Sequence, residues 1–173
     1  RYRTELYKLR RKFMSHADGL IHADLHTSNI MASRDKMKVI DMEFAFMGPF
    51  GYDLGYLVGN LISQYCAACF KRFPSEQSRK QFKAYLLATI KSLIETYMKT
   101  FTLCWEKSVK ERYRGQQGLL QSILQEVMVD MPGYASMVNW FRSVSEIPYP
   151  DFDVIENKDA KRNATVLSLM IDW

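Results

Sequence analysis

The sequence predicts a mostly helical α+β fold in which a small β-hairpin region carries the functional residues. Apolar residues recur at helical spacing through most of the 173 residues. Short apolar segments separated by polar turns are confined to residues 19–51. With 47% hydrophobic and 13% aromatic residues, the chain can bury a hydrophobic core as a single unit, residues 1–173.

The first half of the chain is predicted to hold a helix, the strands and a second helix. Residues 1–14 have helical periodicity, and Leu20-Ile21 is a short apolar segment that predicts a strand. Residues 29–32 and 37–40 flank a polar turn at 33–36, which predicts a hairpin. We expect a loop over residues 48–51, and then a helix with a wide apolar face from Asp53 onward.

The second half is predicted to be helical. Ser75 is a suitable N-cap for the longest helix, which is expected to run to about Trp105. A further helix over roughly 118–130 is expected to stop at Pro132-Gly133, with another turn or two of helix within 134–144. Residues 147–150 predict a loop, and 157–171 predict the last helix.

One constellation of polar residues predicts the chemistry. The segment His22-Ala23-Asp24-Leu25-His26-Thr27-Ser28-Asn29 is followed by Asp41-Met42-Glu43 at the end of the second hairpin strand. Phosphoryl transfer from a magnesium nucleotide needs a carboxylate that orients the attacking hydroxyl and hard oxygen atoms that hold the metal. The pattern therefore indicates a small-molecule kinase.

Each residue of the constellation has an expected role. Asp24 is expected to be the catalytic base, and Asn29 has the offset of the metal-binding Asn in the kinase H-R-D-x-x-x-x-N loop. Asp41 and Glu43 are expected to bind Mg²⁺ from one side of an extended segment, because side chains of a strand alternate. His22 is expected to hold the loop by hydrogen-bonding to backbone.

His22, Asp24 and His26 also match a metallohydrolase ligand pattern. A zinc site would usually need further His or Cys ligands, and only His16 remains among the histidines. The kinase interpretation accounts for more of the pattern, because it also uses Asn29 and the later carboxylate pair.

The segment from Ile21 to Met31 resembles the aminoglycoside phosphotransferase and choline kinase superfamily, whose members have a protein-kinase-like fold. The longer segment Val39–Gly55, with Gly59-Asn60-Leu61-Ile62, is similar to the 5-methylthioribose kinases within it. The resemblance implies ATP- and Mg²⁺-dependent phosphorylation of the anomeric hydroxyl of 5-methylthioribose to the 1-phosphate, a step of methionine salvage.

The resemblance also implies roles for residues outside the first constellation. Asp53 would brace the catalytic loop by hydrogen bonds from the start of its helix. Lys161 and Arg162 stand nearest to the arginine pair with which this family binds substrate. Ala23 replaces the family's usual glycine, so the backbone there is expected to avoid positive φ. Asn29 stands where these kinases often have serine.

Kinases of this fold carry a glycine-rich loop and a strand lysine in an N-terminal lobe. Only 23 residues precede Asp24, and Gly19 is the one glycine among them. The chain is therefore expected to be the C-terminal catalytic and substrate lobe of a longer kinase, inactive without the N-terminal nucleotide-binding lobe. Kinship also suggests a homodimer.

The remaining expectations concern location, partners and rival functions. Three cysteines, with no signal-peptide pattern and no long apolar run, predict a cytoplasmic protein without membrane contact. The formal charge of +5 suits a nucleotide, and nucleic-acid binding is not expected. One alternative is a choline- or aminoglycoside-type phosphotransferase, whose cationic substrate could use the acidic residues between 151 and 159, although a solvated loop is expected there. Another is a non-catalytic kinase-like binding module.

Overall fold

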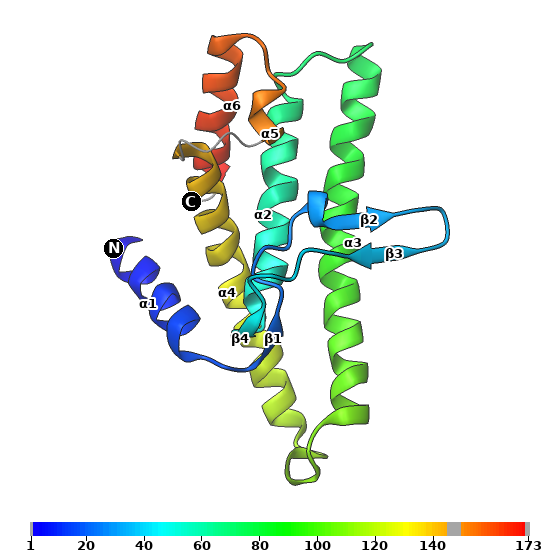
Figure 1. Ribbon diagram of the computed structural model, residues 1–173, viewed down its shortest axis with the longest axis vertical. Helices are drawn as coiled ribbons and strands as arrows, with labels where there is room; N and C mark the ends of the chain where they lie inside the picture. The colour runs from blue at the N-terminus through cyan, green and yellow to red at the C-terminus, as the bar shows by residue number, and fades with distance from the viewer. Residues whose placement is uncertain (1, 145–149, 172–173) are drawn as a thin grey trace.

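The computed structural model describes residues 2–144 and 150–171, and it is mostly helical with two small pairs of antiparallel strands (Figure 1). Most of the loop predicted at 147–150 lies outside the described residues. In these two ranges no helix is both long and apolar enough to cross a membrane. The elements in order are α1 (Tyr2–Ser15), β1 (Gly19–Ile21), η1 (Thr27–Asn29), β2 (Ile30–Ala32), β3 (Met37–Val39), β4 (Phe46–Gly48), α2 (Gly51–Ala68), α3 (Glu76–Ser108), η2 (Glu111–Tyr113), α4 (Gln117–Val144), α5 (Pro150–Asp153) and α6 (Lys158–Ile171).

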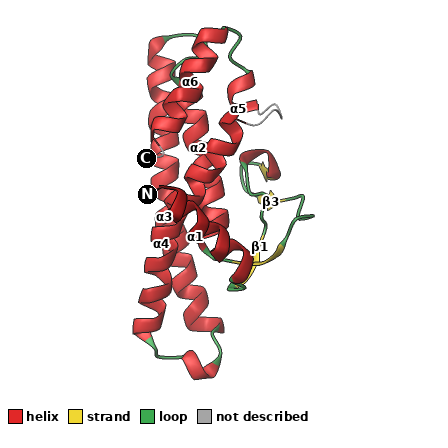
Figure 2. Ribbon diagram, turned by 90° about the vertical axis from the view of Figure 1, so that its left-hand side faces the viewer, coloured by secondary structure: helices red, strands yellow, loops and turns green. Residues whose placement is uncertain are grey.

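Helix α2 is the centre of the molecule and packs against α3, α4 and α6 (Figures 1 and 2). The main core cluster joins α2 to α4 through Leu54, Val58, Val127, Met131 and Ala135. The two backbones approach closely at glycine. A Cβ atom added to Gly55 would lie 2.6 Å from the carbonyl oxygen of Met131, and one at Gly59 would lie 2.7 Å from that of Ala135.

The strands form two separate antiparallel pairs that flank the loops carrying the polar constellation. Strand β2 pairs with β3, as the sequence predicted, with Ile30 opposite Val39. Strand β1 pairs with β4, with Ile21 opposite Phe46. The sequence did not predict β4, because its three residues are too few for a periodic pattern and its partner lies far away in the chain.

Helix α4 continues through Pro132, so the predicted helix end at Pro132-Gly133 is wrong. A proline inside a helix removes one hydrogen bond and costs about 3 kcal/mol. Buried residues lie on both sides of it, Val127 and Met131 before and Tyr134 and Ala135 after. Burying each large apolar side chain contributes roughly 1.5–3 kcal/mol, so packing of this face outweighs the cost of the proline.

Candidate active site

The loop that carries Asp24 leaves β1 and is braced by the first turn of α2. The carboxylate of Asp53 accepts the backbone N–H of His22 at 2.6 Å through Oδ2, and that of Ala23 at 2.9 Å through Oδ1. Burial raises the pKa of Asp53, whereas the two N–H donors oppose this rise by favouring the charged carboxylate. Asp53 therefore makes the bracing contacts that were expected of it.

The expectation that Ala23 avoids positive φ is wrong, because its φ is 67°. This left-handed conformation costs a residue with a Cβ roughly 1–2 kcal/mol. The two hydrogen bonds to Asp53 hold the backbone N–H groups immediately before the strained torsion and offset its cost. The loop therefore keeps a turn suited to glycine although it carries alanine.

His22 and Asn29 tie the loop to the segment that contains Asp41. The Nε2 atom of buried His22 lies 2.8 Å from the carbonyl oxygen of Ile40, which is the backbone contact that the sequence predicted. The backbone N–H of Ile40 donates to the carbonyl oxygen of Asn29 at 3.0 Å. The Nδ2 of Asn29 donates to the backbone carbonyl of Asp24 at 3.0 Å. Asp24, Asn29 and the residue before Asp41 are therefore held in one hydrogen-bonded unit.

The Asp24 carboxylate is partly accessible, with 27% of its side chain exposed. Its Oδ1 accepts a hydrogen bond of 2.8 Å from the hydroxyl of Tyr56 on α2. Its Oδ2 lies 3.4 Å from both His26 Nε2 and Asn29 Nδ2. Burial and the nearby Asp24 carboxylate raise the pKa of Tyr56, so the phenol remains a donor. Tyr56 was not predicted from the sequence, although its position three residues after Asp53 puts both on one face of α2.

Asp41 and Glu43 do not lie on an extended segment, so the argument from alternating side chains is wrong. Asp41 has a φ of 66°, and the N–H of Ala45 donates to the carbonyl of Met42 at 3.1 Å, which closes a turn around Glu43. Both carboxylates are exposed. The backbone bends here because the chain must leave β3 and return to pair β4 with β1.

The donor set of this region fits a hard divalent cation. Asn29 turns its amide nitrogen toward Asp24, which leaves its amide oxygen facing away, and Asp41 is exposed and follows Ile40, whose N–H donates to the carbonyl oxygen of Asn29. Within the described parts of the chain, no three His, Cys, Asp or Glu residues lie close enough together to hold a metal. Mg²⁺ usually takes only one or two protein carboxylates and completes its shell with water and phosphate oxygens.

Asp24 opens into a cavity of about 880 Å³ between α1 and α4, which is large enough for a small substrate. Arg3 and Arg10 of α1 line it, and among the described residues Asp24 is the one acidic residue in its lining. Most of the other lining side chains are apolar or aromatic, namely Leu6, Tyr7, Phe44, Tyr52, Tyr56, Met137, Val138, Trp140 and Phe141. The site therefore combines a carboxylate with apolar walls and two cations.

A buried polar network lies behind the loop. Arg142 and Asp151, whose side chains are 4% and 8% exposed, form an ion pair at 2.6 Å. Asn60 donates to Asp151 at 3.0 Å and accepts the backbone N–H of Thr27 at 2.9 Å. Although Arg142 favours the carboxylate, burial raises the pKa of Asp151. The prediction of a solvated acidic loop is therefore wrong for Asp151, which supports the segment after Asp24.

Lys161 and Arg162, predicted to bind substrate, lie on α6. Lys161 forms an ion pair with Asp153, and Arg162 is exposed. Among the described residues no hydrogen bond or ion pair connects either side chain to the loop around Asp24. The guanidinium carbon of Arg142, another arginine in the late part of the chain, lies 6.0 Å from the centre of the Tyr56 ring, beside this loop.

Comparison with known proteins agrees with this geometry. The sequence profile of the phosphotransferase enzyme family matches residues 2–93. Methylthioribose kinase of Geobacillus thermodenitrificans is 36% identical over 168 residues, covering 95% of the chain and 40% of that protein. Those of Bacillus cereus strain B4264 and Pectobacterium atrosepticum are 32% and 31% identical, covering 92% and 88% of the chain and 38% of each protein.

The chain spans about two fifths of the length of these curated relatives. The matched region includes the Asp53-braced loop, the two strand pairs, all of α2 and about half of α3. The chain belongs to the phosphotransferase enzyme family.

Proposed function

We propose that the protein is an ATP-dependent small-molecule kinase in which Asp24 is the catalytic base. The observation that carries this proposal is the placement of Asp24, with its carboxylate at the wall of a substrate-sized cavity and its backbone bonded to Asn29. His22 and Asn29 in turn hold Ile40, the neighbour of Asp41. A base and hard-oxygen donors thus share one rigid unit, as phosphoryl transfer requires.

In the proposed reaction the acceptor hydroxyl oxygen attacks the γ-phosphorus of ATP and the bond to the bridging oxygen breaks, releasing ADP. Asp24 takes up the hydroxyl proton. Tyr56 holds Oδ1 of Asp24, so the remaining oxygen can face the acceptor. Bound Mg²⁺ would neutralise charge on the phosphate oxygens, and Asn29, Asp41 and Glu43 are the residues proposed to hold it.

The proposed acceptor is the anomeric hydroxyl of 5-methylthioribose, in methionine salvage. The matched relatives are named methylthioribose kinases. The cavity beside Asp24 supports a neutral acceptor with an apolar substituent, because its walls are largely apolar and its two cations, Arg3 and Arg10, exceed the one carboxylate among its described lining residues. Those arginines disfavour choline or an aminoglycoside by like-charge repulsion. Lys161 and Arg162 remain predicted substrate ligands.

We further propose that these residues form the C-terminal lobe, completed by an N-terminal nucleotide-binding lobe and inactive without it. Apolar side chains are exposed along residues 20–47, which supports a docking surface there. The set comprises Leu20, Met31, Met37, Val39, Ile40, Met42, Phe44 and Met47. The cytoplasmic location and the homodimer remain predictions.

The test of the substrate assignment is a coupled ADP-release assay on the product of the complete gene. We expect turnover with 5-methylthioribose and little with choline or an aminoglycoside. Replacing both arginines (Arg3→Gln with Arg10→Gln) should reduce the ratio of turnover with 5-methylthioribose to turnover with the cationic acceptors. The control variant, Lys99→Gln with Lys107→Gln on α3, removes the same charge elsewhere and should leave this ratio unchanged.

Turnover of a cationic alcohol in preference to the sugar would contradict the assignment of 5-methylthioribose as the substrate, but it would still support the proposal that the protein is a kinase. Silence on all three acceptors, together with no binding of magnesium nucleotide, would instead support the non-catalytic binding module.

A further inference from the structure

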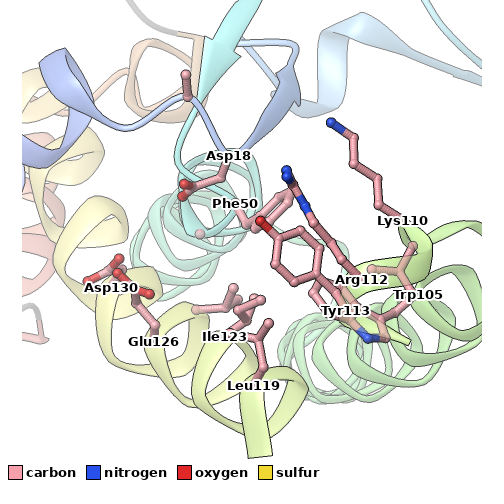
Figure 3. A pocket seen from close by; sticks show the side chains of 14 residues that line it. Asp18, Phe50, Trp105, Lys110, Arg112, Tyr113, Leu119, Ile123, Glu126 and Asp130 are labelled. Atoms are coloured by element: carbon pink, nitrogen blue, oxygen red, sulfur yellow. The ribbon is translucent and has the colours of Figure 1, made fainter. Parts of the chain in front are cut away.

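A second cavity, of about 550 Å³, lies between the start of α2, the end of α3, η2 and α4 (Figure 3). None of the residues assigned above to phosphoryl transfer lines it. Its volume is in the range of pockets that bind small molecules. This cavity is therefore a candidate site separate from the one at Asp24.

Aromatic rings form its apolar part. Phe50, Trp105 and Tyr113 line the cavity, together with the aliphatic side chains of Leu119 and Ile123. Phe101 fixes two of the rings, because it packs edge-on to Phe50 with centroids 5.0 Å apart and stacks on Trp105 at 6.4 Å. These surfaces suit a flat apolar ligand.

The acidic lining residues gather on one side of the cavity. Asp18, Glu126 and Asp130 lie there (Figure 3). Lys12 forms ion pairs with Glu126 and Asp130, and His16 Nδ1 lies 3.7 Å from Asp18. One lysine beside three carboxylates leaves this side with net negative charge at neutral pH.

The basic lining residues lie on the other side. Figure 3 shows Lys110 and Arg112 there, across the rings of Phe50 and Tyr113 from the carboxylates. The guanidinium carbon of Arg112 lies 4.8 Å from the centre of the Tyr113 ring. Among residues 2–144 and 150–171, neither cation forms an ion pair with a carboxylate. The cavity therefore presents opposite charges on opposite sides of an aromatic middle.

We propose that this cavity binds an elongated zwitterion with a flat apolar body. Its ammonium group would face Asp18 and Glu126, its carboxylate would face Lys110 and Arg112, and its ring would lie against Trp105 and Tyr113. A ligand with one charge could pair with the charged residues on one side of the cavity only. Because charge-assisted hydrogen bonds are stronger than neutral ones, we expect such a ligand to bind more weakly than the zwitterion.

The test uses 4-(aminomethyl)benzoate as the probe, with benzylamine and 4-methylbenzoate as analogues that each lack one charge. The full-length protein is labelled with 5-fluorotryptophan and titrated by ¹⁹F NMR. Trp105 reports on this cavity and Trp140 on the one at Asp24. Each resonance is assigned by a Trp→Phe substitution, and folding of every variant is checked by thermal unfolding.

We expect a saturable shift of Trp105 and binding of the zwitterion about tenfold tighter than either analogue. The double variant Lys110→Gln with Arg112→Gln should bind the zwitterion only as tightly as the wild-type protein binds benzylamine. The pair Lys99→Gln and Lys107→Gln, exposed on α3 and outside the cavity lining, should keep wild-type affinity. The proposal would be overturned if the ¹⁹F resonance of Trp105 did not shift on titration, or if all three probes bound with equal affinity. Unchanged affinity of the Lys110/Arg112 variant for the zwitterion would also overturn it.

Discussion

At the scale of single residues, the backbone of the loop before Asp24 is strained at Ala23, and the hydrogen bonds to Asp53 offset the cost of this strain. Replacing Ala23 by Gly removes the Cβ from a backbone with φ of 67°. We expect the free energy of unfolding to rise by roughly 0.5–1 kcal/mol, measured by urea denaturation. The control is Ala32→Gly in β2, where φ is not positive and the same change should destabilise. Equal effects at both positions would contradict the assigned strain.

Asp53 is the second residue-scale determinant, because its two oxygens serve two backbone donors. The Asp53→Asn variant keeps one acceptor oxygen, so we expect a loss of roughly 1–3 kcal/mol in the free energy of unfolding.

The raised pKa of Asp53 also gives this loss a pH dependence. The Asp53 carboxyl binds its proton more tightly in the folded protein than in the unfolded chain. The contribution of this protonation to the free energy of unfolding is therefore present at low pH and is lost as the pH rises through the raised pKa. The difference in the free energy of unfolding between wild type and Asp53→Asn should therefore become smaller from pH 4 to pH 7. Urea titrations at both values measure it, and a difference that grows would show the opposite pKa shift.

At the scale of elements, the contact of α2 with α4 depends on the absence of side chains at Gly55 and Gly59. Gly55→Ala would place a methyl group 2.6 Å from the Met131 carbonyl oxygen. We expect destabilisation of roughly 1–3 kcal/mol by thermal or urea unfolding, because backbone cannot yield as a side chain can. Gly118→Ala is the matched control, since nothing lies within 4 Å of its added Cβ and alanine favours helix. A neutral Gly55→Ala would mean that the helices separate easily.

The elements also show what the sequence could predict. The β2–β3 hairpin and the N-cap of α3 at Ser75 depend on local patterns, and both are present. The brace at Asp53 was implied by the family resemblance, and its two hydrogen bonds are present. The passage of α4 through Pro132 depends on packing against α2, which no local pattern encodes. The Arg142–Asp151 pair is similar, because two charges look solvated until tertiary structure buries both. The bend at Asp41 required knowledge that β4 returns to β1.

At the scale of the whole molecule, a helical bundle presents one rigid loop at the edge of a substrate-sized cavity. Helix α2 connects the parts, because Asp53 holds the backbone of the loop, Tyr56 holds the Asp24 carboxylate and Asn60 holds Thr27. The helix is in turn packed into the core on its opposite side through Leu54 and Val58. Stability of the bundle and geometry of the proposed catalytic base are therefore linked through one element.

The most direct test of the central claim is single-turnover phosphorylation of 5-methylthioribose by the complete gene product, wild type against Asp24→Asn. Asp18→Asn, the same chemical change outside the cavity at Asp24, is the control. General-base assistance contributes on the order of 10²–10⁴ in rate, so we predict a loss of that size for Asp24→Asn alone, with magnesium-nucleotide binding retained. An Asp24→Asn rate within a few-fold of wild type would contradict the assignment of Asp24 as the base.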